Sequence, residues 1–286
     1  MIRSLVLGLM CMAFNAVQGQ DILSDIRFNA DIVANAGNFD HRQRANDSLL
    51  VHFENWISSD DFNNDDLYTI EWISVKEPED QSFKIITWQL QSAEDTFKYF
   101  GYLLKDGKLT KLEEKEISSD PEYDVLYSDE WIGALYYNIL TVNDGTSTYY
   151  VLFGFNGYSK YNNLKVADVL TFEGDKPIFG AEIFVQSSEN GRANKQTRLM
   201  LDYSGDSNVS LNYNPGLDMI THDHLIQRIG RIPGQGPTLL PDGSYVGWKW
   251  AGDHFEYVEK IYHQVLDEAP RPQPILDQRK NTIDGK

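Results

Sequence analysis

The chain has a single cysteine, Cys11, and this residue lies within an N-terminal segment that has the pattern of a signal peptide. Arg3 gives the segment a positive start, an apolar run covers residues 5–14, and residues 17–19 end it with small side chains at the −3 and −1 positions. We therefore expect cleavage before Gln20 and export of the rest. A cysteine-free exported chain can form no disulfide, so a hydrophobic core has to stabilise its fold.

The composition limits the compartments and the classes of binding partner that we expect for this chain. The formal net charge of −18 repels phosphate backbones and anionic headgroups, which argues against nucleic-acid binding and electrostatic membrane docking. The N-terminal apolar run is too short for a membrane span, so we expect none in the mature chain. An acidic exported protein without disulfides fits the bacterial periplasm, the cell surface or the extracellular space.

One segment has the periodicity of an amphipathic helix. Its large apolar residues recur at helical spacing and form one stripe, which predicts a helix over residues 40–58. The preceding stretch, residues 21–36, has weaker spacing and is expected to add a helical turn. The stripe consists of Leu49, Leu50, Phe53, Trp56 and Ile57.

After residue 67 the apolar period changes to two, which is typical of strands. Asp106-Gly107 is a strong hairpin signal between the segments 99–104 and 109–114. Turn residues separate all the later strands, which indicates antiparallel neighbours. The expected strands are 68–75, 83–90, 99–104, 109–114, 131–140, 149–155, 166–172, 178–184, 198–203, 209–213, 219–222, 245–250 and 255–262.

These elements predict a mainly β fold: an antiparallel meander, as a strongly curved sheet or a sandwich or barrel-like arrangement, with the N-terminal helix packed on it. We expect residues 1–19 to be the signal peptide and residues 20–265 a single β-rich domain. A polar stretch within residues 118–128 is the candidate internal seam. Residues 266–286 are a Pro-rich C-terminal tail.

Residues 229–241 interrupt the strand rhythm with three glycines and three prolines. This composition predicts a structured loop of about a dozen residues. Long loops in compact domains often carry function.

Several segments resemble a family of uncharacterised exported β-rich proteins of Bacteroidota. The resemblance covers roughly residues 125 to 260 and implies export and a β-rich fold, but no activity. The segments that carry it are residues 131–138, 149–155, 165–172, 177–184, 201–204 and 219–225.

The sharpest candidate for chemistry is His222-Asp223-His224. On a regular strand His222 and His224 project from one face, and such a pair can hold Zn²⁺ when a third ligand is present. His254, Asp253 or His263 is the candidate third ligand. The alternative is a strand end with two solvated or hydrogen-bonded imidazoles.

Trp248 and Trp250 share one face of a predicted strand, and Tyr245 and Tyr257 lie nearby. These side chains could form an aromatic platform for a sugar ring. The alternative is the buried face of a sheet, because inward alternation is what any half-buried strand shows.

Two carboxylates, Asp168 and Glu182, interrupt apolar strands. Placed across a cleft, such a pair could perform the acid–base work of a glycosidase. The alternative is that both face outward into solvent.

The sequence identifies no catalytic residue and requires no cofactor. The expected role is a non-catalytic binding or accessory protein of the bacterial envelope or surface, with a glycan as one candidate ligand. The alternative is a hydrolase that acts on glycans, with or without a metal. A deep cleft with converging carboxylates or histidines would favour the enzyme, and a shallow aromatic face would favour the binding protein.

The signal peptide gives the first testable prediction. Mass spectrometry of the mature N-terminus in the envelope or secreted fraction should find Gln20 as the first residue, because residues 17–19 fit the cleavage pattern. Recovery of an intact Met1 form in the cytoplasm would contradict export.

Overall fold

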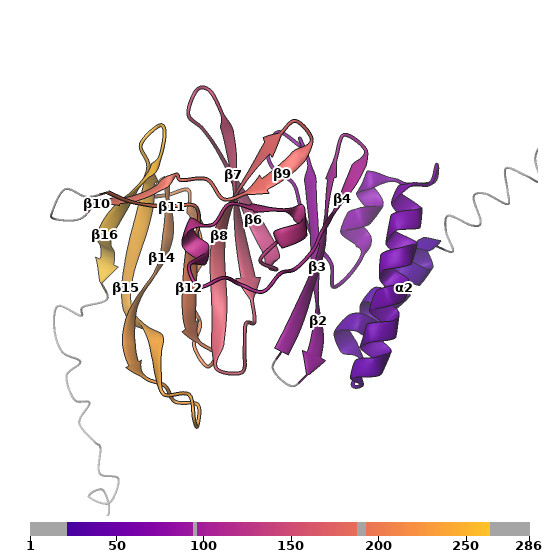
Figure 1. Ribbon diagram of the computed structural model, residues 1–286, viewed down its shortest axis with the longest axis horizontal. Coiled ribbons are helices and arrows are strands. Elements are labelled where there is room, and N and C mark those ends of the chain that lie inside the picture. Colours follow the sequence, from indigo (N-terminus) through magenta and orange to yellow (C-terminus); the bar gives the residue numbers. More distant parts are fainter. Residues whose placement is uncertain (1–21, 94–95, 188–192, 264–286) are drawn as a thin grey trace, which may run out of the picture.

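The computed structural model describes residues 22–93, 96–187 and 193–263. The fold is mainly β, with antiparallel sheets and an N-terminal pair of helices packed on them, as the sequence predicts (Figure 1). The predicted signal peptide, residues 1–19, and the predicted tail, residues 266–286, lie outside the described residues.

Two helices form the outer layer. The first is described over residues 22–35, and the second, α2, spans Phe39–Ile57. The side chain of Asn38 caps α2 by accepting a hydrogen bond from the Asp40 backbone N–H at 2.8 Å. The predicted helix over 40–58 is confirmed. The weaker helical spacing over 21–36 belongs to a complete helix.

The segment after α2 departs from the expected strand over 68–75. Residues Asn64–Thr69 form a 3₁₀ helix, η1, whose first turn Asn63 caps through a hydrogen bond from the Asp65 N–H. Only Ser74–Lys76 pairs as a strand, β1. The expectation fails because Trp72 has a left-handed backbone, with φ of 70°, that no regular strand contains.

The first sheet packs against the helices. Its order is β1-β2-β3-β4, and all neighbours are antiparallel. The Asp106-Gly107 hairpin forms as predicted, with both residues at positive φ. The other strands are β2 (Lys84–Ala93), β3 (Thr96–Lys105) and β4 (Lys108–Leu112).

The central sheet has the order β5-β9-β8-β7-β6, and β12 also pairs with β8. The short 3₁₀ turn η2 (Pro121–Tyr123) precedes β5 in the chain, and the short 3₁₀ turn η3 (Ser128–Glu130) follows it. The strands are β5 (Leu126–Tyr127), β6 (Leu135–Asn143), β7 (Thr148–Asn156), β8 (Asn162–Glu173), β9 (Lys176–Phe179) and β12 (Leu199–Ser204).

The third sheet has the order β11-β10-β16-β15-β14-β13. The β10–β16 pair is parallel, and the other pairs in this sheet are antiparallel. The strands are β10 (Phe184–Ser187), β11 (Ala193–Gln196), β13 (Leu211–Asn214), β14 (Met219–Ile229), β15 (Pro237–Trp250) and β16 (Phe255–His263).

The predicted loop over residues 229–241 is wrong in extent. Strand β14 continues to Ile229 and β15 begins at Pro237, so the loop covers only residues 230–236. Pro237 is the first residue of its strand, a position where the missing N–H costs no ladder hydrogen bond.

Hydrophobic clusters join these layers in a stack of helices, first sheet, central sheet and third sheet (Figure 1). Successive side chains of a strand point to opposite faces, so Ile86 packs on the helices while Ile85 packs on the central sheet. In the same way Leu152 faces the first sheet and Val151 faces the third. Both faces of the central sheet are therefore buried.

The helix stripe gives the second prediction. Phe53 and Trp56 are 0% and 1% exposed and pack in the cluster between α2 and the first sheet. Truncation of either to Ala should lower the free energy of unfolding by about 3–5 kcal/mol, the usual range for a large aromatic in a core. Chemical denaturation measures the change in the free energy of unfolding.

The matched control is Phe28→Ala on the first helix, because Phe28 is 65% exposed. A loss for Phe53→Ala no larger than that for Phe28→Ala would show that the stripe does not stabilise the fold.

Candidate functional site

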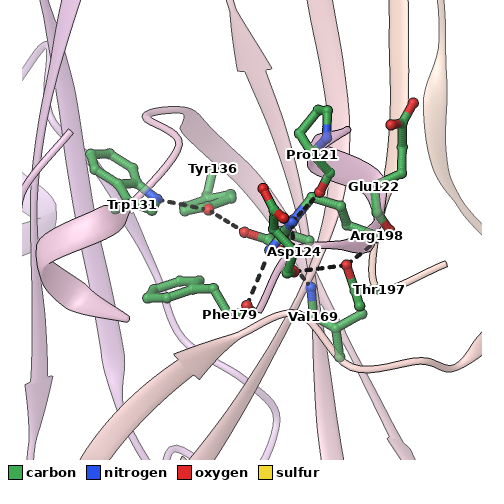
Figure 2. A network of polar contacts seen from close by, with 10 residues as sticks. Pro121, Glu122, Asp124, Trp131, Tyr136, Val169, Phe179, Thr197 and Arg198 are labelled. Carbon is green, nitrogen blue, oxygen red and sulfur yellow. Dashed lines mark hydrogen bonds and ion pairs between the residues drawn. The ribbon is translucent and has the colours of Figure 1, made fainter. Parts of the chain in front are cut away.

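Asp168 lies on β8 with no exposed surface and forms an ion pair with the equally buried Arg198, at 2.8 Å between Oδ1 and Nε. Figure 2 shows Arg198 within its network of polar contacts. The expectation of an outward-facing Asp168 is wrong, because both faces of the central sheet are covered. Glu182 is exposed, as expected. A wholly buried, paired carboxylate cannot face a cleft opposite Glu182.

The remaining polar atoms around this ion pair also have partners. The Asp168 Oδ2 atom accepts from the Tyr136 hydroxyl at 3.4 Å, and burial raises the pKa of Tyr136 well above its usual value. Trp131 Nε1 donates to that hydroxyl at 2.9 Å. Arg198 also donates to the backbone carbonyls of Pro121, Asp124 and Phe179. The network therefore joins the η2 segment to strands β8 and β9 of the central sheet.

The candidate metal ligands have separate partners. His222 is buried; its Nε2 accepts from Trp248 Nε1 at 3.3 Å, and its Nδ1 lies 2.9 Å from the Asp223 carbonyl. With Nε2 accepting, Nδ1 is the protonated nitrogen, so neither nitrogen has a lone pair for a metal. Burial also lowers the pKa of His222 and keeps the ring neutral.

His224 and His254 point to other partners. A β-bulge between Asp223 and Leu225 breaks the strand alternation, and His224 Nδ1 contacts Asp242 Oδ2 at 2.9 Å. His254 contacts Asp253 at 2.6 Å and Glu256 at 3.6 Å. In the described ranges no three or more His, Cys, Asp or Glu side chains are grouped to hold a metal ion. The side chain of His263 lies outside the description.

The predicted aromatic platform faces the core. Trp248 is buried against Phe184 and Tyr257, with ring centroids 5.5 and 5.2 Å away. Trp250 is half-buried and lies 4.8 Å from the Phe255 ring. Tyr245 is half-buried and precedes a second bulge on the same strand. Trp248 and Trp250 therefore belong to the buried face of the sheet and pack between the central and third sheets.

A different tryptophan, Trp72, is exposed. It lies in the loop between η1 and β1 with 56% of its surface accessible. Its φ of 70° makes it the only aromatic residue with positive φ in the part of the chain that the structure describes. Sequence alternation missed it because it placed Trp72 within a strand. Only the backbone dihedral angle shows that Trp72 lies in a turn.

Trp72 stands beside a hollow of about 260 Å³. The hollow lies where the end of the first helix, the first sheet and the start of β6 meet. Its lining has an apolar part, one exposed aromatic ring and two side-chain amides from β2. The residues are Val33, Ala34, Trp72, Gln89, Gln91, Phe97 and Leu135.

Both amides have their oxygen directed to a neighbouring group of the protein. Arg42 Nη1 donates to Gln91 Oε1 at 2.7 Å, and a guanidinium has only donors, so the amide oxygen must face it. Tyr99 accepts from the Gly157 N–H at 2.7 Å and donates to Gln89 Oε1 at 3.2 Å. Burial raises the pKa of Tyr99, which therefore keeps its proton.

Both amide oxygens are thus engaged inside the protein. Neither Nε2 group has a hydrogen-bond partner within the described residues, so each can donate to a ligand. The lining that the structure describes contains no acid, base or nucleophile. The arrangement is suited to binding.

Comparisons of the chain with protein-family models, curated proteins and solved structures find no match. Within the described ranges, no helix has the length and apolar character needed to cross a membrane.

The buried ion pair gives the third prediction. Asp168→Asn should lower the free energy of unfolding by about 3–5 kcal/mol, because it leaves the Arg198 charge buried and unpaired. Urea denaturation of the purified protein measures the loss.

The control is Glu113→Gln, which removes the exposed partner of Lys111 at 3.9 Å and should cost less than about 1 kcal/mol. Equal losses for the two variants would mean that the buried pair does not hold the sheet together.

Proposed function

We propose that this protein is an exported, non-catalytic binding protein of the bacterial envelope or surface, and that its ligand binds in the hollow beside Trp72. The observation that carries the proposal is an exposed tryptophan in a left-handed backbone beside a concave site. Apolar hollows with a few convergent polar groups are the usual form of a small-ligand site.

The backbone of Trp72 supports a role at the surface. A bulky residue at positive φ costs on the order of 1–3 kcal/mol and persists where the surroundings impose it, often at binding sites. Because more than half of the surface of Trp72 is exposed, core packing offsets little of that cost. The ring is therefore placed to contact something outside the fold.

The surroundings favour binding over hydrolysis. The hollow is lined by amides and apolar side chains, whereas general acid–base catalysis needs a titratable group within hydrogen-bond reach of the substrate. The candidate carboxylate Asp168 is occupied by Arg198 beneath the surface. These observations support a protein that holds its ligand unchanged.

The fourth prediction tests this proposal with Trp72→Gly. Glycine adopts positive φ without steric cost, so the free energy of unfolding should stay equal or rise by up to about 1 kcal/mol. Ligand binding should be lost together with the ring. Saturation-transfer NMR of a small-molecule library that includes sugars and aromatic fragments measures binding, and the ligands should be recovered unchanged.

The control is Tyr158→Gly, which removes another exposed aromatic ring that does not line the hollow. It should keep the ligands of the wild-type protein. An identical set of bound compounds for wild type and Trp72→Gly, or conversion of a bound compound into product, would overturn the proposal.

A further inference from the structure

We infer that the hollow beside Trp72 takes a single neutral carbohydrate ring. This inference rests on the proposed function and adds the chemical class of the ligand. Three properties of the described lining lead to it: the direction of its hydrogen bonds, its lack of charge, and its size together with the exposed indole.

The hydrogen bonds require a ligand that carries acceptors. The oxygens of Gln89 and Gln91 are engaged by Tyr99 and Arg42, so the lining offers two N–H₂ groups and no free amide oxygen. A ligand without acceptors would desolvate both groups and leave them unpaired. Sugar hydroxyl and ring oxygens can accept both hydrogen bonds.

The charges favour a neutral ligand. No lining residue is ionised, and Arg42, the nearest cation in the amide network, donates to the Ala36 and Gln91 carbonyls and to the Gln91 side chain. An anion would gain no direct ion pair from the lining and would approach a chain with a formal charge of −18. A cation would meet amide N–H donors, which repel it.

The size and shape favour one ring. The volume of about 260 Å³ is below the roughly 300 Å³ at which pockets for drug-sized ligands begin. A pyranose ring has an apolar C–H face that can lie on the Trp72 indole and a polar edge that can reach the two amides. The two kinds of surface in the hollow match the two kinds of surface on the ring.

The β2 register supports simultaneous contact with both amides. Gln89 and Gln91 are two residues apart on one strand and therefore lie on the same face, opposite Tyr99 and Phe97 of β3. Phe97 lines the same hollow, so the amides and an apolar wall border one space.

The fifth prediction uses Gln89→Glu and Gln91→Glu. Each change keeps an oxygen for Tyr99 or Arg42 but replaces the N–H₂ donor with a second acceptor oxygen. We expect the full-length protein to bind methyl glycosides of glucose, galactose or N-acetylglucosamine with millimolar affinity. Isothermal titration should show at least a tenfold loss for each variant, at an unchanged melting temperature.

The matched control is Gln227→Glu, an exposed glutamine of β14 that does not line the hollow, and it should bind as the wild type does. Indole and phenol serve as acceptor-poor ring probes. Their affinity should be weaker than that of the glycosides in the wild-type protein.

The outcomes separate the two proposals. If indole or phenol binds in a Trp72-dependent manner while the glycosides do not, the carbohydrate inference fails and the binding function stands. If the glycosides bind equally to wild type and to both Gln→Glu variants, the inference also fails. If no probe binds in a Trp72-dependent manner, both proposals fail.

Discussion

The buried ion pair between Asp168 and Arg198 is the polar contact around which several segments of the central sheet are joined. Moving two charges out of water costs several kcal/mol each, so such a pair persists only where its remaining donors also find acceptors. Arg198 meets this condition by donating to the carbonyls of Pro121, Asp124 and Phe179. Gly180 permits this close approach, because a Cβ there would lie 2.6 Å from the Asp124 carbonyl oxygen. One side chain, directly before β12, thus joins β8, β9 and the η2 segment.

The central sheet fixed in this way supports a layer on each face, and hydrogen bonds across the layers shape the hollow. The Thr87 hydroxyl accepts from the Tyr136 N–H at 3.2 Å, which ties β2 to β6. Tyr99 of β3 accepts from the Gly157 N–H after β7. Because Tyr99 also orients the Gln89 amide, the residue that joins two sheets also directs the Gln89 Nε2 donor of the proposed site. The walls of the hollow are therefore built from the same contacts that hold the sheets together.

Periodicity predicted the helix stripe around Phe53 and most of the strands, and turn residues predicted the Asp106-Gly107 hairpin, because these features depend on local sequence. It could not predict that Asp168 is buried: alternation shows which residues share a face, whereas the coverage of that face depends on segments distant in sequence. A bulge after Asp223 breaks the regular alternation on which the H-x-H geometry depends. The exposed turn position of Trp72 was not predicted, because a residue at positive φ does not change the two-residue apolar period of the sequence.

Titration of ¹⁵N-labelled protein with methyl glucoside tests whether the hollow offers two amide donors to a neutral ring. The measured quantities are the side-chain amide resonances of the protein. The Nε2 signals of Gln89 and Gln91 should shift together with the Trp72 indole signal. Other glutamine signals should stay in place. Shifts confined to glutamines outside the hollow, or saturable binding that leaves these two amides unchanged, would contradict it.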